Sequence, residues 1–596
     1  MSSAVAPPGS GGFLEQLRSG LRREFRDGHW TGELASSALA TAVAVVALHR
    51  AGNLQDRGLV ASGLRWLAEH QNADGGWGDT VLSSGNISTT VLGWAACGYA
   101  GRGDAEARTA ELKAAAWITI RAGGTEPAQL AQAIEARYGD DRTFAVPILT
   151  LCAIAGRLGV DPWQWVRPLP FELAAFPRAW FRFLDLQVVS YALPALIAVG
   201  QVCFHRRKPR NPLGLLLRWL TRPRTLRRLR TIQPGSGGYL EAVPLTGFVV
   251  MSLVDGGNGD HAVTAKGLAF LRRSRRADGS WPIDENLATW VTTLSLNALA
   301  AGGALADTLD APAREQVLDW LLAQQGKVMH PYTGAAPGAW AWTDLPGGVP
   351  DADDTAGAVI ALHHLAADRP AVHAAASAGL AWLIGVQNRD GGIPTFCRGW
   401  GALEFDRSAP DLTAHALMAF AAWRPAIRGR LALALDRAAA RAQRYLQRCQ
   451  RADGSWIPLW FGNQHVAGDR NPTYATARVV SALALAGAQD GMRRRGEAWL
   501  VRNQHVDGGW GGGGTSPASI EETGLALEAL ARTGDPALAP VLARGLAALR
   551  RLTGDGTSLP PAPIGFYFAK LWYFERLYPL VFATGAAGRL AARGIS

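Results

Sequence analysis

Apolar residues recur at helical spacing along almost the whole chain. The clearest segments are each about one helix long and are separated by Gly, Pro and Asp: 35–49, 356–368, 412–423, 475–487 and 522–533. Runs of β-branched residues are few, and Ala, Leu, Gly and Arg dominate the composition. The pattern predicts an all-α protein built from stacked helical hairpins.

A repeat runs through the segments that separate these helices. Its five copies are GLRWLAEHQNADGGWG (63–78), GLAFLRRSRRADGSW (267–281), GLAWLIGVQNRDGGI (379–393), AQRYLQRCQRADGSW (442–456) and GEAWLVRNQHVDGGW (496–510). The shared frame is an aromatic–Leu pair followed by Q-x-x-x-G-x-W, with Arg275 replacing Gln and Ile393 replacing Trp. Because Gly permits a sharp exit from a helix, we expect the Trp to fold back on the helix end and the Gln amide to bind backbone groups. Repeated hairpins of this kind can close into α/α barrels.

The net charge of +11 is concentrated in one block. Residues 205–230 hold ten Lys and Arg and no acid, so the rest of the chain carries 50 basic against 49 acidic residues. Such a block, interleaved with Leu and Trp, fits a solvated loop, a nucleic acid backbone or an anionic membrane surface. The uncharged stretch 186–204 directly before it favours the membrane over nucleic acid. Pro194 weakens that stretch as a spanning helix, so we expect a buried helix or one that enters a single leaflet.

The N-terminus and the cysteines bear on the compartment. The first 25 residues lack the apolar core of a signal peptide, which predicts a location on the cytoplasmic side. The five Cys, at 97, 152, 203, 397 and 449, show no CxxC spacing and are expected to be reduced thiols without zinc. No G-x-S-x-G, P-loop, HExxH or DDxxD motif is present.

An acidic cluster, PDADDTAG (350–357), stands immediately before an apolar helical run. One of Asp351 and Asp354 can cap that helix, but a cap requires a single Asp. Crowded carboxylates in apolar surroundings have raised pKa values, so one of these Asp residues can stay protonated at neutral pH. A protonated Asp facing apolar surroundings can donate its proton to a weakly basic group such as an alkene.

A second element is PDLTAHALMAF (410–420). Asp411 and His415 are four residues apart and therefore lie on one face of a helix. On its own, a His in an apolar helix is more often a core residue. Next to an acid site, it can hydrogen-bond the catalytic Asp and tune its acidity.

Aromatic residues cluster around these motifs. Trp340 and Trp342 precede the acidic cluster, Phe396 and Trp460 follow the third and fourth repeats, and GFYFAKLWYFERLYPL (565–580) is dense in aromatics. Most of them fit ordinary core packing. Together, aromatic faces can stabilise carbocations where water is excluded.

The tryptophan repeats and the D-x-D-D-T-A motif resemble those of the squalene–hopene cyclase family of class II terpene cyclases, over nearly the whole chain. The resemblance implies that Asp353 is the proton donor, flanked by Asp351 and Asp354. It makes His415 the hydrogen-bond partner of the acid and Asp411 a member of the same network. The positions implied for cation-stabilising aromatics are Trp342, Phe396, Trp460 and Phe574.

The resemblance also implies the architecture and partners. It predicts an N-terminal segment (1–25), a first α/α barrel (26–265) that includes a membrane-contact region (186–230), and a second barrel (266–596) carrying the acid. A monotopic membrane protein, often a homodimer, is expected, with no metal or organic cofactor. Two features depart from the family: Trp290 stands near the place of a usual carboxylate, and the loop between Phe396 and Asp411 is short.

Three functions remain open from the sequence. The first is an isomerase that cyclises a linear polyprenyl chain, squalene above all, to a hopene-type triterpene. The second is a class II cyclase of a shorter prenyl diphosphate or a prenylated aromatic, for which the basic block would serve a diphosphate. The third is a non-catalytic α/α scaffold, or a barrel like the protein prenyltransferases, which would need a zinc set of Asp, Cys and His.

Overall fold

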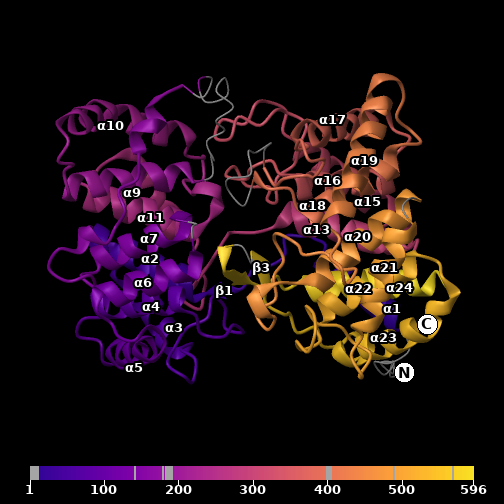
Figure 1. Cartoon of the computed structure of the whole chain (residues 1–596), viewed down its shortest axis with the longest axis horizontal. Helices are drawn as coiled ribbons and strands as arrows, with labels where there is room; N and C mark the ends of the chain where they lie inside the picture. Colours follow the sequence, from indigo (N-terminus) through magenta and orange to yellow (C-terminus); the bar gives the residue numbers. More distant parts are fainter. Residues whose placement is uncertain are drawn as a thin grey trace, which may run out of the picture.

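The protein is helical, as its sequence pattern predicts. The computed structural model describes residues 12–139, 142–177, 180, 192–396, 406–487, 490–566 and 569–595. Within these ranges the strands form two small antiparallel pairs, β1 (Ser36–Ser37) with β2 (Trp281–Pro282) and β3 (Ile564–Phe566) with β4 (Leu571–Tyr573). The helices form two groups that lie side by side along the long axis of the molecule (Figure 1). The expected all-α class with two α/α barrels is confirmed.

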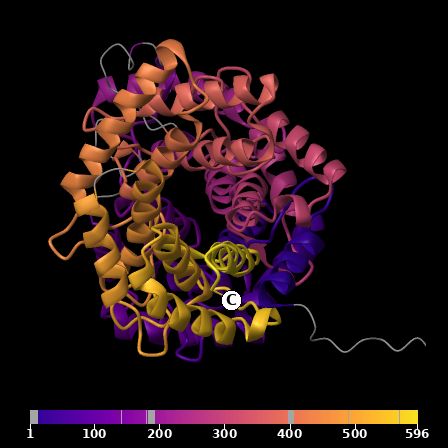
Figure 2. The same ribbon diagram turned by 90° about the vertical axis from the view of Figure 1, so that its right-hand side faces the viewer.

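The second group is a closed double ring. Its inner helices contact one another in sequence, and the last returns to the first: α13 (Ala288–Ala301), α16 (Ala352–Ala366), α18 (Pro410–Trp423), α20 (Pro472–Ala486), α22 (Ile520–Arg532) and α24 (Tyr578–Ala591). The outer helices are α15 (Ala311–Ala323), α17 (Pro370–Val386), α19 (Gly429–Cys449), α21 (Asp490–Arg502) and α23 (Ala539–Leu552). Figure 2 shows this ring end-on. The inner helices are apolar nearly all round because neighbours cover them on both sides, whereas α19 is strongly amphipathic and faces water on one side.

The first group is built in the same way. α2 (Ala38–Ala51) contacts both α4 (Ile87–Ala100) and α11 (Val243–Asp255), and α7 (Arg142–Ile154) contacts α4, α9 (Leu193–Arg206) and α11. Outside them lie α3 (Arg57–Glu69), α5 (Ala105–Ala122), α6 (Pro127–Tyr138), α10 (Pro212–Ile232) and α12 (Ala262–Arg273). The boundary expected at residue 265 falls inside α12. Since α12 packs against α11 and α2, the first group extends through Arg273.

The N-terminal helix joins the second group rather than the first. α1 (Phe13–Glu24) packs against α24 and lies near α14 (Leu305–Thr308). Farther along, the Trp30 amide donates to Thr292 Oγ1 of α13 at 3.0 Å, and the Glu33 amide donates to Glu575 Oε1 at 2.9 Å. The second ring is therefore completed by residues from both ends of the chain.

The tryptophan and glutamine of the repeat make the contacts expected of them, with the helix end and with backbone carbonyls. The indole Nε1 groups of Trp77, Trp281, Trp456 and Trp510 each donate to the carbonyl of the Leu ten residues earlier, at 2.7 or 2.8 Å. Gln504 Nε2 donates to two carbonyls, Gly508 O of its own turn and Val541 O of α23, both at 2.9 Å. The Gln side chain thus joins consecutive outer helices, while the Trp closes the end of its own helix.

Two further copies of this arrangement escaped the sequence pattern. Gln325 donates to Gly338 O and Ala375 O, and Trp340 Nε1 donates to Leu321 O, although the spacing is longer than in the other copies. Gln233 makes the same pair of bonds, with Tyr239 taking the place of the Trp. These two copies keep the hydrogen-bonding geometry of the repeat although their sequences or spacings differ from it.

The stretch 186–204 lies partly outside the described residues. From Leu193 onward it forms α9, which is buried within the first group. None of the helices in the described parts of the chain has the length and apolar character needed to cross a membrane.

Candidate active site

The inner helices of the second ring bring their N-terminal ends together on the side that faces the first group (Figures 1 and 2). Each inner helix is followed by an outer helix that returns the chain, so all six inner helices run in the same direction. The sequence-predicted acid and histidine lie at the starts of α16 and α18. Unsatisfied N–H groups and the positive end of the helix dipole favour acidic side chains at such a position.

Asp351 caps α16. Its Oδ1 accepts from the amides of Asp353 at 2.9 Å and Asp354 at 2.8 Å, which confirms that one carboxylate of the cluster serves as the helix cap. Burial raises the pKa of Asp351 to about 7. Burial and the adjoining charge of Asp351 raise the pKa of Asp354 well above its usual range. Burial and the crowding of carboxylates therefore both favour the protonated form of Asp354.

Asp353 contacts His415. It is the most accessible of the three carboxylates, with 18% of its side chain exposed, and its Oδ1 lies 2.5 Å from His415 Nδ1. His415 is buried, and a Cβ added at Gly357 would stand 3.5 Å from its Cε1, so the ring packs directly against α16. The hydrogen bond that the sequence predicts between this His and the acid is present, and it fixes the orientation of both side chains.

Asp411 is close to this pair without bonding to it. Its Oδ1 accepts from the Leu459 amide at 3.3 Å, and its Oδ2 is buried with no hydrogen-bond partner among the described residues. Burial, followed by the charge of Asp353, raises the pKa of Asp411 to about 7. Asp411 is thus coupled to the acid through its charge.

Three of the predicted aromatic residues converge. The Phe396 ring lies 6.4 Å from Trp342 and 6.2 Å from Trp460, both edge-to-face, and Trp460 lies 4.5 Å from Phe566. Polar bonds orient the two indoles: Trp342 Nε1 donates to Asp284 Oδ2 at 3.1 Å and Trp460 Nε1 to Thr395 Oγ1 at 2.9 Å. These partly exposed rings form an aromatic surface contributed by segments far apart in the sequence.

At the C-terminal end the structure places a neighbour of the predicted residue in this surface. Tyr573, at the end of β4, lies 5.3 Å from Phe566, ring to ring. Phe574 follows immediately after the end of β4, and its side chain is partly buried. The backbone carbonyl of Phe574 accepts from the Ala35 amide at 2.9 Å.

A chain of hydroxyl and indole groups backs the acid and was not foreseen as part of the site. Trp290 Nε1 donates to Tyr578 Oη at 2.9 Å, and Tyr578 Oη lies 3.2 Å from Tyr573 Oη. The Trp290 ring stands edge-on to His415 at 6.1 Å. The only feature of the sequence that singles out Trp290 is its position near the place of a usual carboxylate. The two tyrosines carried no motif of their own.

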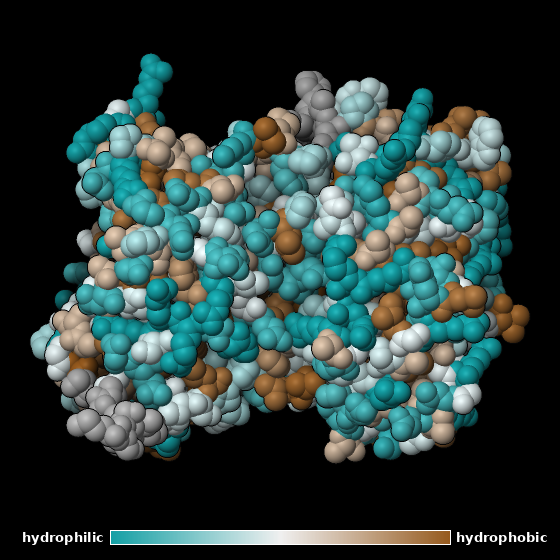
Figure 3. Space-filling model, turned by 180° about the vertical axis from the view of Figure 1, so that it is seen from behind, coloured by the Kyte–Doolittle hydropathy of each residue, from teal (hydrophilic) through white to brown (hydrophobic). Residues whose placement is uncertain are grey.

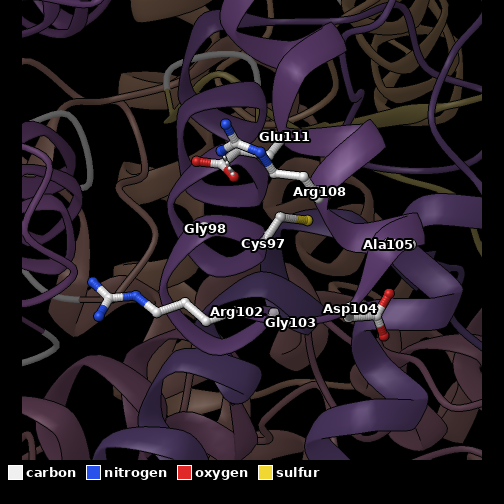
Figure 4. A pocket seen from close by; sticks show the side chains of 9 residues that line it. Cys97, Gly98, Arg102, Gly103, Asp104, Ala105, Arg108 and Glu111 are labelled. Atoms are coloured by element: carbon white, nitrogen blue, oxygen red, sulfur yellow. Dashed lines mark hydrogen bonds and ion pairs between the residues drawn. The ribbon is translucent and has the colours of Figure 1, made fainter.

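The described residues offer no cluster of three or more His, Cys, Asp or Glu that could hold a metal ion. A separate hollow of about 500 Å³ lies between α4 and α5 of the first group (Figure 4). Its lining includes the Glu111 carboxylate, which is ion-paired with Arg108 and Arg157, and Cys97. Burial raises the pKa of the Cys97 thiol to about 12, so this thiol stays protonated and unreactive.

Comparison with known families gives two matches, one in each part of the chain. The squalene-hopene cyclase N-terminal domain matches residues 16–231, and the squalene-hopene cyclase C-terminal domain matches residues 286–552. The squalene–hopene cyclase of Bradyrhizobium diazoefficiens is 24% identical over 603 residues, which covers 87% of this chain and 85% of that protein.

Two other comparisons extend this result. A terpene cyclase-glycosyl transferase fusion protein of Humicola fuscoatra is 28% identical over 618 residues, covering 87% of this chain. The chain spans only 44% of the length of that relative. The solved structure of ent-copalyl diphosphate synthase from Streptomyces platensis superposes with a TM-score of 0.60 at 20% identity, over 98% of this chain and 99% of that one. That likeness shows a shared fold.

Proposed function

Because the chain belongs to the squalene-hopene cyclase family, we propose that it is a class II terpene cyclase that protonates the terminal alkene of a linear polyprenyl substrate. The observation that carries this proposal is the Asp353–His415 pair, set among carboxyl groups whose pKa values burial has raised and beside an aromatic surface. A strong acid next to aromatic rings is the combination that alkene protonation and carbocation stabilisation require.

In the first step the Asp353 O–H bond breaks and a C–H bond forms at the less substituted alkene carbon, which leaves a tertiary carbocation. His415 holds the carboxyl group in place and stabilises the carboxylate once the proton has left. Successive ring closures move the positive charge along the substrate, past Phe396, Trp342 and Trp460. The cascade ends when the last cation loses a proton or captures water.

Squalene is the substrate that we propose first, with a hopene-type triterpene as the product. The support is the family membership and the match to a squalene–hopene cyclase over most of both chains. Purified protein in detergent is incubated with squalene, and products are identified by gas chromatography and mass spectrometry. Farnesyl and geranylgeranyl diphosphate, with and without Mg²⁺, and a prenylated aromatic are assayed in parallel. If only one of those other substrates gives cyclic products, that compound is the substrate in place of squalene. If none of the substrates gives a cyclic product, the proposal is overturned.

We also propose that the protein docks on the surface of an anionic membrane through α10. Exposed apolar residues gather on the first half of this helix: Leu213 (75%), Leu216 (52%), Trp219 (66%) and Leu220 (51%). The same helix and its approach carry the ten basic residues of the block, of which Arg206 and Arg218 are ion-paired with Asp255 and Glu172. Figure 3 shows hydrophobic and hydrophilic residues intermixed on the surface of the first group, which lies on the right in that view.

The second ring adds to the same surface. Tyr332 packs in one apolar cluster with Leu229 and Ile232 of α10, and the nearby Val328 and Met329 are 74% and 63% exposed. Apolar side chains flanked by Lys and Arg suit insertion at the level of lipid headgroups. Flotation with vesicles tests this: binding to vesicles containing phosphatidylglycerol, weakened by Leu216→Glu, is expected. Equal recovery of parent and variant in the vesicle fraction would contradict it.

A further inference from the structure

Trp342 is fixed at one edge by a carboxyl group. Its indole Nε1 donates to Asp284 Oδ2 at 3.1 Å, and its backbone carbonyl accepts from the amides of Thr289 and Trp290 at 3.0 and 3.2 Å. The ring is partly exposed and stands edge-to-face with Phe396 in the aromatic surface. Because the N–H bond lies in the plane of the indole, the hydrogen bond to the carboxyl group leaves the faces of the ring free.

Asp284 is itself held at the junction of the two groups. It follows β2 by two residues, and β2 pairs with β1 at that junction (Figure 1). Its Oδ1 accepts from the Glu285 amide at 2.8 Å, and its backbone pairs with Ala242, the residue that precedes α11 of the first group. Beside that pair, the Val243 amide donates to the Ile283 carbonyl at 3.1 Å. The backbone of the first group therefore sets where the carboxyl group lies.

A second carboxyl group, that of Glu241, is buried next to this contact. Glu241 is the last residue of η4 (Tyr239–Glu241) and is 1% exposed. Its Oε1 accepts from Ser236 Oγ at 2.6 Å and from the Gly347 amide at 2.7 Å. Leu240 and Glu241 both have left-handed backbone angles, with φ of 58° and 52°. Such angles are strained for residues with a side chain and cluster at functional sites, so backbone strain and a buried acid coincide here.

The acidic side chains behind the N–H edge of Trp342 repel one another. Burial, followed by the charge of Glu241, raises the pKa of Asp284 well above its usual range. Burial also raises the pKa of Glu241, although two hydrogen bonds and the charge of Arg273 oppose the rise, and the charge of Glu285 adds to it. Asp284 and Glu241 form no ion pair with any described residue. A positive charge close to them relieves the repulsion.

This arrangement strengthens the attraction of Trp342 for a carbocation. A hydrogen bond from the indole N–H to a carboxyl group shifts electron density into the ring, because hydrogen-bonded groups in a chain polarise one another. Trp attracts cations over its face more strongly than Tyr or Phe, and the attraction grows where water is excluded. If the cation beside this ring is raised in energy, the ring closure that forms it slows, and the preceding cation has more time to lose a proton. The cascade then ends with fewer rings.

Resting on the proposed function, we propose that Asp284, backed by Glu241, is a positioning residue that fixes Trp342 and strengthens its attraction for the passing carbocation, so that cyclisation continues beyond this ring. Asp284 acts through the indole and forms or breaks no covalent bond. Glu241 contributes its charge and, through the Gly347 amide, also fixes the segment that leads from Trp342 to Asp351.

The test combines substitutions at the two bonded residues. Asp284→Leu removes the acceptor, and Asp284→Asn keeps an acceptor without a charge. With squalene, or whichever of the tested substrates the parent cyclises, Asp284→Leu is expected to raise the share of products with fewer rings about tenfold, and Asp284→Asn less. In a Trp342→Phe background no N–H group remains, so Asp284→Leu is expected to change the product ratios by less than about twofold.

A matched control comes from another bond between an indole and a carboxyl group. Trp117 Nε1 donates to Asp74 Oδ2 at 2.8 Å in the first group, and neither residue belongs to the aromatic surface. Asp74→Leu is expected to leave the product ratios unchanged. The circular dichroism of each variant is compared with that of the parent. If Asp284→Leu does not fold, Asp284→Asn is compared in both backgrounds instead.

A cationic probe tests the same contact without turnover. Binding of protonated N,N-dimethylfarnesylamine and of farnesol, an uncharged counterpart, is measured by calorimetry. Asp284→Leu is expected to weaken binding of the ammonium compound about tenfold and to leave farnesol binding unchanged. Unchanged product ratios would overturn the inference, as would equal effects with Trp and with Phe at position 342, or equal losses for the two probes. If the parent cyclises none of the substrates, the proposed function is overturned, and the two probes alone decide the inference.

Discussion

Asp353 and His415, sixty-two residues apart in sequence and on different inner helices, meet through a 2.5 Å contact between Oδ1 and Nδ1. The contact joins α16 to α18 at the end of the ring where their N-termini meet. It gives the most accessible carboxyl group of the cluster a fixed direction, while burial raises the pKa values of its neighbours Asp351 and Asp354. The proposed chemistry follows from this arrangement of the three carboxyl groups.

Asp353→Asn is expected to lower cyclisation by about a thousandfold, because an amide cannot donate the proton that starts the cascade. Product formation is measured by mass spectrometry under initial-rate conditions. The side chain is partly exposed and does not cap the helix, so the thermal midpoint should stay near that of the parent. Retained turnover in this variant would show that another group is the acid.

His415→Phe is expected to lower the rate by about ten- to a hundredfold, since it removes the bond that orients the acid and stabilises its carboxylate. The variant's pH–rate profile is recorded beside the parent's. A role in tuning the acid predicts that the alkaline limb shifts. An unchanged profile with a lower rate would point to packing alone.

Activity is expected to fall above about pH 7. The pKa values of Asp351 and Asp411 are both raised to about 7, so the cluster around Asp353 loses protons above that pH and its negative charge grows. A loss of about tenfold per pH unit is the expected slope for one essential proton. The measurement is kcat/KM from pH 5 to 9. A flat profile over that range would contradict the prediction.

Glu521→Gln is expected to flatten the dependence of stability on pH. Burial, with the charge of Glu522, raises the folded-state pKa of Glu521 to about 8, above the unfolded value of about 4.3. The stability gained from its bound proton is therefore complete below about pH 4 and is lost as pH rises through 8. The thermal midpoint of the parent should decline from pH 5 to 9, and that of the variant should decline less. Parallel curves would refute the assignment.

Gln504→Ala is expected to destabilise the second ring by about 1–3 kcal/mol, because two backbone carbonyls lose their donor. Gln324→Ala serves as the control, since Gln324 donates only to Trp320 O within its own helix. Urea unfolding of both variants is followed by circular dichroism. Equal midpoints would mean that the repeat glutamine contributes nothing beyond its own turn.

Much of this arrangement could be predicted from the sequence. Helical periodicity and the tryptophan repeat predicted the hairpins and the way each Trp closes its helix, because both depend on local spacing. The pairing of Asp353 with His415 came from motifs that each occupy one helix end. The part that Tyr578 and Tyr573 play in the site could not be predicted, since it depends on which elements become neighbours once the ring closes. The contact of Tyr573 with Phe566 depends on the pairing of β3 with β4, which the sequence does not supply.

The contact of α1 with α24 has a consequence for how the protein is made. α1 belongs to the same ring as α24, and the whole first group lies between them in the sequence. α1 must therefore wait, with its apolar face uncovered, until more than five hundred further residues have been synthesised. The first ring can fold during synthesis, whereas the ring that bears Asp353 is completed only when α24 has been synthesised. A chain truncated just before α24 would thus carry Asp353, His415 and the aromatic surface without a closed second ring.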